Sequence, residues 1–280
     1  MIATNYRLTM EMNRQAALAR DIAREQTEIS TTKRIQAPSD DPVAAARVSE
    51  IGRTQANEAS FKSNLDLANA LSAGAETTLE TVANAVTRAH ELMVAGANGT
   101  LSATNRAAMA LELRSIAAEI TTLKDARDAR GNRLFMSGWA LQIPVAAGLA
   151  VTAVGTREEV FETVPTAGGP RDIAAIVADA ATALESGGSA PIGASIAELV
   201  AGVEHVASVR GQQGARGNRI QQLVERYETA KFQLTEERSA LEDTDVRAAI
   251  ARIQAKQLTL DAAQAVFARV NQSTLFDILR

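Results

Sequence analysis

Cysteine is absent from this 280-residue chain, and aromatic residues make up only 3% of it. Without cysteine the chain has no disulfide, no cysteine-ligated metal site and no thiol nucleophile. Hydrophobic residues still account for 46% of the sequence, and much of this share is alanine. Alanine favours helices and fills little volume. The composition therefore predicts long, thin helical bundles rather than a thick globular core.

The charge balance argues against nucleic acid, and the residue inventory argues against an enzyme. The formal net charge is −4, so the chain lacks the strong basic field typical of nucleic-acid-binding proteins. Its two histidines, His90 and His205, each lie inside a helical pattern, where a lone histidine is usually structural or solvated. The sequence has no Gly-x-x-x-x-Gly-Lys phosphate loop and no Gly-x-Ser-x-Gly motif. We therefore predict no catalytic residue, no metal site and no cofactor.

No targeting segment is visible at the start of the sequence. Charged residues interrupt the first twenty positions, which therefore lack the continuous apolar core of a cleavable signal peptide. The most apolar window, residues 141–154, contains Pro144 and Gly148 and is too short to span a bilayer. We expect no membrane association, and we expect any export to use a route without a cleavable signal peptide.

Both ends of the chain carry narrow apolar seams with three- and four-residue spacing. A seam of this kind resembles a coiled-coil stripe and needs a second helix to bury it. We predict that residues 1–36 and 246–280 form paired helices of an inner layer, and that their seam also mediates assembly. The residues of this predicted assembly seam are Leu8, Met12, Leu18, Ile22, Ile29, Ile250, Ile253, Leu260, Phe267 and Val270.

The segments between the two ends have the long helical periodicity of a rod-like bundle. This bundle is predicted to comprise residues 37–138 and 171–245. Its longest helix should run from Pro42 to about Gly96, and the next from about residue 105 to residue 130. Along the longest helix one heptad phase reads Ile51, Glu58, Leu65, Ser72, Leu79, Val86 and Met93.

Residues 139–170 break the helical period. They are rich in valine, glycine and proline, a composition that favours short strands joined by turns. We predict two to four strands in a small β-rich outer region that projects from the far end of the bundle. The predicted fold class is mainly α: an elongated helical bundle with coiled-coil-like paired N- and C-terminal helices and a small β-rich outer region.

One segment stops the first helix and starts the second; it reads Pro38-Ser39-Asp40-Asp41-Pro42. Pro38 disfavours helical geometry at the residue before it, so the first helix should end earlier. Asp41 is placed to cap the second helix, with Pro42 as its first residue. Ser39 and Asp40 add acceptors and negative charge where a new helix exposes unpaired N–H groups.

The same segment carries a family resemblance. Read from Lys33, it is Lys-Arg-Ile-Gln-Ala-Pro-Ser-Asp-Asp-Pro, which resembles the N-terminal signature of the flagellin superfamily in the form found in hook–filament junction proteins. The superfamily also resembles this chain at residues 98–102, 131–138, 214–219 and 274–279.

The resemblance implies a structural, extracellular protein of the bacterial flagellum that leaves the cell by flagellar type III export. Its subunits would polymerise through their terminal helices to form the junction between hook and filament. The implied partners are further copies of the chain, hook-associated protein 1, flagellin and a cytoplasmic export chaperone. Two alternatives stay open, namely a short flagellin that forms the filament itself and a helical binding or signalling module.

Overall fold

The structure is a computed structural model that describes the backbone of residues 2–278 and the side chains of residue 6 and residues 9–269. The chain divides into two compact units: a terminal unit of Met1–Ala56 and Ala230–Arg280, and a central unit of Asn57–Thr229. The helices are α1 (Ile2–Thr31), α2 (Pro42–Gly96), α3 (Ala103–Lys124), α4 (Ile173–Ser186), α5 (Ser189–Glu242) and α6 (Val246–Ile278), with a π-helix η1 (Glu158–Glu162). The strands are β1 (Gln142–Ala146), β2 (Leu149–Thr152), β3 (Val164–Thr166) and β4 (Gly169–Arg171).

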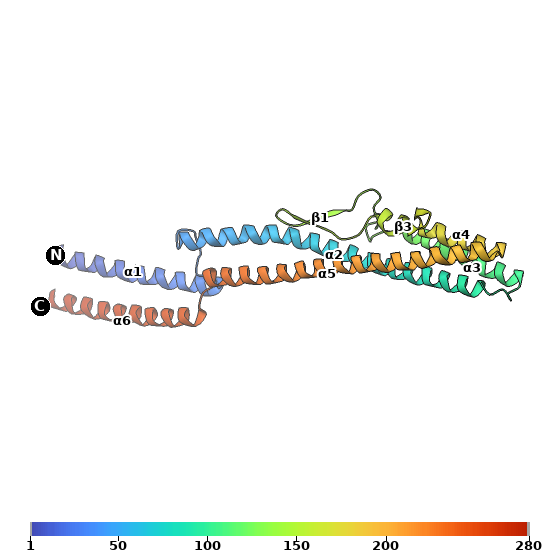
Figure 1. Cartoon of the computed structure of the whole chain (residues 1–280). Coiled ribbons are helices and arrows are strands. Elements are labelled where there is room, and N and C mark those ends of the chain that lie inside the picture. Colours follow the sequence, from blue (N-terminus) through green and yellow to red (C-terminus); the bar gives the residue numbers. More distant parts are fainter. Residues whose placement is uncertain (1, 279–280) are drawn as a thin grey trace. The chain divides into compact units, whose positions relative to one another are not determined.

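In the terminal unit, α1 and α6 lie side by side and run antiparallel, so that the free ends of both helices lie at the same end of the pair (Figure 1). Ion pairs fix the direction, because Asp21 contacts Lys256 whereas Glu28, further along α1, contacts Arg252 near the start of α6. The pairing of N- and C-terminal helices that the seams predict is confirmed.

The end of α1 is set by backbone contacts rather than by proline. The helix stops at Thr31, whereas the periodicity continues to about Arg34. Thr32 adopts a left-handed conformation with φ of 58°, which is unusual for a β-branched residue. Its carbonyl accepts the N–H of Thr244 at 2.9 Å, and the N–H of Arg34 donates to the carbonyl of Glu242 at 2.7 Å. This short antiparallel bridge ends the helix well before Pro38.

The core of the central unit lies between α2 and the helices packed around it. The heptad phase predicted on α2 is confirmed, because six of its seven positions are buried and only Glu58 is partly exposed; the buried six are Ile51, Leu65, Ser72, Leu79, Val86 and Met93. α3 and α4 pack against each other. Ser102 caps α3 through its hydroxyl, which accepts the N–H of Asn105, and Asp172 caps α4 in the same way through the N–H groups of Ala174 and Ala175.

α3 is shorter than its periodicity predicts. It ends at Lys124 rather than near residue 130. The carboxylate of Asp128 accepts the N–H groups of Arg130 and Asn132 at 2.9 and 2.8 Å, and the N–H of Leu134 donates to the carbonyl of Ala126 at 2.8 Å. These bonds offer the backbone a turn in place of another helical step.

Four short strands form two separate antiparallel sheets, β1–β2 and β3–β4, and the π-helix η1 lies between them in sequence. The expectation of two to four strands is met, but the β1–β2 hairpin does not project from the far end of the bundle. Asn64 of α2 donates to the carbonyl of Pro144 at 2.8 Å, and Gln213 of α5 donates to the carbonyl of Ala153 at 2.9 Å. The β1–β2 hairpin is therefore held against the sides of α2 and α5.

α5 is apolar along part of its length. It contains a window that is long and apolar enough to cross a membrane by length and composition, with 33% of the window buried inside the protein. Buried residues of α5, such as Leu199 and Val206, belong to the core of the central unit, which accounts for the apolar composition of this helix.

Candidate assembly surface

Among the described side chains, the α1–α6 pair buries two residues of the predicted assembly seam and leaves the others half-buried or exposed. Ile22 and Ile253 are buried between the helices. Met12 and Ile250 are exposed, with 58% and 43% of their surface accessible. The half-buried members are Leu18, Ile29, Leu260 and Phe267. The side chains of Leu8 and Val270 lie outside the described residues.

The outer face of α6 also carries large apolar side chains. Leu258 is 72% exposed and Val266 is 63% exposed. Leu258 follows Ile253 by five residues, which turns it by roughly 140° around the helix and away from α1. A stretch of paired helix with leucine, valine and methionine on its open sides has apolar surface that a further helix could cover.

Charged residues hold the middle of the pair together, and sequence reasoning missed them. Glu25 is buried, with 9% of its side chain accessible, and its Oε1 accepts hydrogen bonds from Lys256 at 2.9 Å and Arg252 at 3.2 Å. The hydrogen bond with Glu25 raises the pKa of Lys256 above its ordinary value. Among the described residues, none donates to Oε2 of Glu25. A polar group buried in a helix seam costs stability but fixes the register of the two helices.

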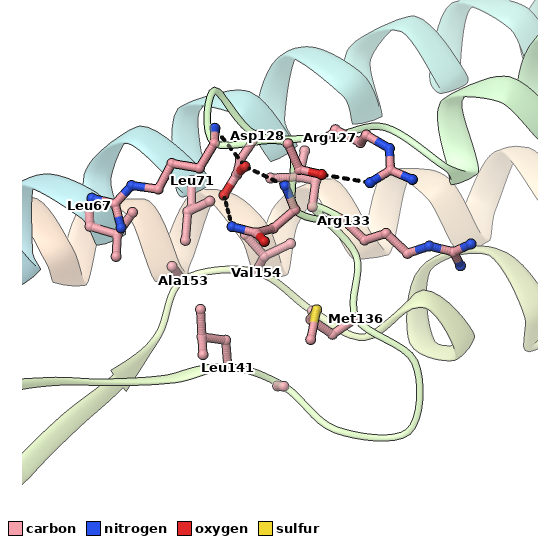
Figure 2. Close-up of a pocket in the computed structure, with 15 residues that line it drawn as sticks. Leu67, Leu71, Arg127, Asp128, Arg133, Met136, Leu141, Ala153 and Val154 are labelled. Atoms are coloured by element: carbon pink, nitrogen blue, oxygen red, sulfur yellow. Dashed lines mark hydrogen bonds between the residues drawn. The ribbon is translucent and has the colours of Figure 1, made fainter.

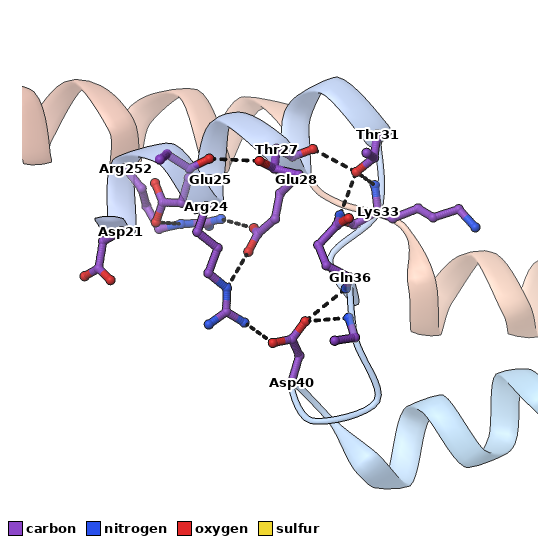
Figure 3. Close-up of polar contacts among 12 residues, drawn as sticks. Asp21, Arg24, Glu25, Thr27, Glu28, Thr31, Lys33, Gln36, Asp40 and Arg252 are labelled. Carbon is purple, nitrogen blue, oxygen red and sulfur yellow. Dashed lines mark hydrogen bonds and ion pairs between the residues drawn. The ribbon is translucent and has the colours of Figure 1, made fainter. Parts of the chain in front are cut away.

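The helix-start segment is tied to the same cluster (Figure 3). Oδ2 of Asp40 accepts the N–H groups of Gln36 and Ala37 at 3.0 and 2.9 Å, and these bonds lower the pKa of Asp40. Oδ1 of Asp40 accepts a hydrogen bond from Arg24 at 2.9 Å, and Arg24 also lies 3.6 Å from Glu28. Residues 32–41 form the connector between α1 and α2. Asp40 therefore holds this connector against α1.

Asp41 caps α2, as the sequence predicts. Its Oδ1 accepts the N–H of Ala44 at 3.0 Å, and Pro42 is the first residue of α2. Ser39 and Pro38 lie exposed in the turn before it. Within the helix-start signature, Asp41 thus caps α2 and Asp40 holds the connector. The contact of Asp40 with Arg24 joins residues sixteen positions apart, so no local sequence pattern reveals it.

A second set of contacts joins the connector to the end of α5. Lys33 forms an ion pair with Glu242, whose carboxylate also accepts a hydrogen bond from Arg238 at 2.8 Å. These two contacts lower the pKa of Glu242, the bond from Lys33 most. Asp245 caps α6 through the N–H of Ala248 at 3.1 Å. The segment after α1 and the segment between α5 and α6 are therefore both held in place by ion pairs and backbone hydrogen bonds.

A pocket of about 480 Å³ in the central unit is an alternative candidate site (Figure 2). Leu71, Leu141 and Val154 contribute apolar side chains to it, and the loop after α3 contributes arginines such as Arg133. The carboxylate of Asp128 points into this loop and accepts its backbone N–H groups. Asp128 is therefore committed to shaping the loop rather than to binding.

We next consider side chains that could support catalysis or bind a metal. His205 lies with Nε2 3.2 Å from the carbonyl of Val160, partly buried in the central unit. Across the described part of the chain, no group of three or more His, Asp or Glu residues is arranged to hold a metal ion.

Comparisons with known proteins point to one family for both ends of the chain. The bacterial flagellin N-terminal helical region matches residues 2–139, and the bacterial flagellin C-terminal helical region matches residues 197–279. Flagellar hook-associated protein 3 of Salmonella typhimurium is 32% identical over 108 residues, which are 39% of this chain. The match spans about a third of that relative, 34% of its length.

Solved structures share the fold at lower sequence identity. Flagellar hook-associated protein 3 of Legionella pneumophila superposes with a TM-score of 0.63 at 12% identity, covering 69% of this chain and 98% of the other. FlgL of Xanthomonas campestris superposes with a TM-score of 0.59 at 15% identity, covering 68% of this chain and 99% of the other.

Proposed function

This chain belongs to the bacterial flagellin family, and we propose that it is a structural subunit that polymerises through its terminal helices to form the junction between the flagellar hook and filament. The observation that carries the proposal is the α1–α6 pair, which leaves Met12 and Leu258 exposed on its open sides. Covering such surface with helices of neighbouring subunits would bury it, at roughly 25 cal/mol per Å² of apolar area.

The junction position draws support from two further observations. The segment with Pro38 and Pro42 has the junction-protein form of the family signature. Pro38 lies in the turn before α2, and Pro42 is the first residue of that helix. The relative from Salmonella and the superposed structure from Legionella pneumophila also carry the name hook-associated protein 3. We propose hook-associated protein 1 as the neighbour on the hook side and flagellin as the neighbour on the filament side.

Export and localisation follow from the same proposal. The protein would leave the cell by flagellar type III export and reside in the extracellular flagellum. A cytoplasmic chaperone would cover α6 before secretion, since Leu258 and Val266 are exposed there. In this role the chain has no catalytic task and no cofactor.

A short flagellin is the alternative, and the match of both ends to flagellin helical regions favours it equally. It differs from the junction proposal in the number and position of the subunits along the flagellum. Both readings need the same terminal-helix contacts.

A matched pair of leucine substitutions tests the assembly surface. Leu258 on α6 and Leu111 on α3 are exposed to nearly the same extent, 72% and 68%, so neither Leu258→Lys nor Leu111→Lys should perturb its own helix by more than about 0.5 kcal/mol. Each variant would be expressed in cells that lack the natural gene, and filaments would be counted by electron microscopy. We expect Leu258→Lys to remove filaments and Leu111→Lys to retain them. Normal filaments with Leu258→Lys would contradict assembly through the terminal helices.

A further inference from the structure

Two long faces of the central unit carry opposite charge. On α2, residues 63–86 contain Asp66, Glu76 and Glu80 and no lysine or arginine. On α5, residues 205–226 contain four arginines and one carboxylate, that of Glu225. Both segments are helical throughout. Arg219 and Arg226 are seven residues apart and lie on nearly the same side of α5, whereas Arg210 lies on the opposite side of the helix.

The basic face of α5 borders a groove of about 670 Å³ between this helix and Leu149 of the β1–β2 hairpin. Arg219 and Arg226 line it together with the amides of Asn218 and Gln222. The two arginines are exposed, and within the described part of the chain no carboxylate pairs with either guanidinium. In contrast, Arg216 on the same helix is paired with Glu159 at 2.7 Å.

The acidic face of α2 carries carboxylates that have no cationic partner among the described residues. Glu76 and Glu80 are exposed, one helical turn apart, and neither carboxylate forms an ion pair among the described residues. Arg219 and Arg226 lie two turns apart, roughly 10 Å along the helix axis. Long arginine side chains reach two carboxylates at such spacing, and guanidinium–carboxylate pairs combine charge with a defined hydrogen-bond geometry.

We propose that the groove lined by Arg219 and Arg226 receives the face of α2 with Glu76 and Glu80 from a second copy of this chain. The contact joins two different patches, so it is heterologous and repeats from copy to copy into a ring or a helical array. This inference rests on the proposed function, to which it adds a lateral contact made by the central unit. A second copy is the occupant that the charges favour, because the same chain supplies both complementary surfaces.

Engineered cysteines test the contact directly, because the natural chain has no cysteine and so gives no background cross-links. Gln222→Cys lies between the two arginines, and Thr77→Cys lies beside the two glutamates. In isolated flagella that carry the double variant, a short bis-maleimide should produce covalent dimers and higher multiples on a denaturing gel. Gln222→Cys combined with Ala118→Cys, an exposed position on α3, is the matched control and should stay monomeric.

A charge exchange provides the second test. Arg219→Glu with Arg226→Glu, or Glu76→Arg with Glu80→Arg, places like charges in the contact and should reduce incorporation into flagella by roughly tenfold or more. All four substitutions together restore opposite charges and should return incorporation to within about twofold of the natural chain.

The possible outcomes separate this contact from the proposed function. Cross-linked multiples together with rescue by the fourfold variant would support the contact. Flagella that contain the chain but give no cross-link, or no rescue, would overturn the contact and leave the junction role intact. A chain that is absent from flagella would overturn the junction role, and the contact with it.

Discussion

Lys256 of α6 donates a hydrogen bond to the buried carboxylate of Glu25 on α1, with Nζ 2.9 Å from Oε1, across 231 positions of sequence. This contact, with that of Arg252 to the same oxygen at 3.2 Å, fixes how the two terminal helices lie against each other. A buried charged group of this kind favours one register of the two helices.

Removing Lys256 should therefore loosen the terminal helices. Lys256→Met leaves Glu25 with one cationic partner in a site that is nearly closed to water, which we expect to cost about 1 kcal/mol because Arg252 remains. Hydrogen exchange of α1 and α6 amides should become faster. Arg88→Met, which breaks an exposed pair with Glu112, is the control and should leave α1 and α6 unchanged. Equal exchange in both variants would mean that Glu25 does not hold the pair.

The cap of α2 makes a local prediction. Asp41→Ala removes the acceptor for the N–H of Ala44 and should lower the free energy of unfolding by about 1 kcal/mol. Ser39→Ala, two residues away in the exposed turn, should change it little. The midpoint of urea unfolding measures both, and a similar loss for the two variants would argue against the cap.

Two glycines of α2 should respond to alanine in opposite ways. A Cβ on Gly96 would overlap Cδ1 of Leu184 and lie 3.0 Å from its Cδ2, and Leu184 is fully buried. Gly96→Ala should therefore destabilise the protein by about 1–3 kcal/mol. A Cβ on Gly52 would meet nothing within 4 Å, so Gly52→Ala should stabilise it by about 0.5–1 kcal/mol through helix propensity. Thermal unfolding decides the signs, and a stabilising Gly96→Ala would show that α2 and α4 are less tightly packed than described.

Acid should weaken the connector between α1 and α2. The pKa of Asp40 is lowered by the N–H groups of Ala37 and Gln36, and the pKa of Glu242 is lowered by Lys33. A carboxyl whose folded pKa lies below its unfolded value stabilises the fold above the unfolded pKa, near pH 4, and loses this contribution as the pH falls through the folded pKa. Stability should thus decline below about pH 4.

The double variant Asp40→Asn with Glu242→Gln isolates this effect. It should be less stable than the natural chain at pH 6 and should lose less stability between pH 5 and pH 3. Urea unfolding across this range is the measurement. An unchanged pH dependence would mean that other carboxylates account for acid sensitivity.

Local pattern predicted much of the fold, and contacts between distant residues account for what it missed. The heptad phase from Ile51 to Met93 was visible because each position repeats along one helix face. The cap at Asp41 was visible because aspartate, proline and the following helix are adjacent in sequence. The early end of α1 was not visible, since it depends on the pairing of Thr32 with Thr244, more than two hundred positions away.

The same reasoning applies to the candidate surface. The apolar seam located the helices that pair, because three- and four-residue spacing is a property of one segment. It could not tell Ile253, which faces α1, from Ile250, which is exposed, since the facing side depends on the register of the pair. The spacing of Asp21, Glu25 and Glu28 against Arg252 and Lys256 was the signal that could have revealed this register, once the two helices were known to be antiparallel.

The position of the protein on the flagellum is the central claim, and immunogold labelling of intact flagella tests it most directly. The antibody would be raised against residues 140–170, which include the β1–β2 sheet and most of the β3–β4 sheet. The account predicts a single band of label where the hook meets the filament. Label along the whole filament would identify a flagellin instead, and flagella without any label would contradict a structural role in the flagellum.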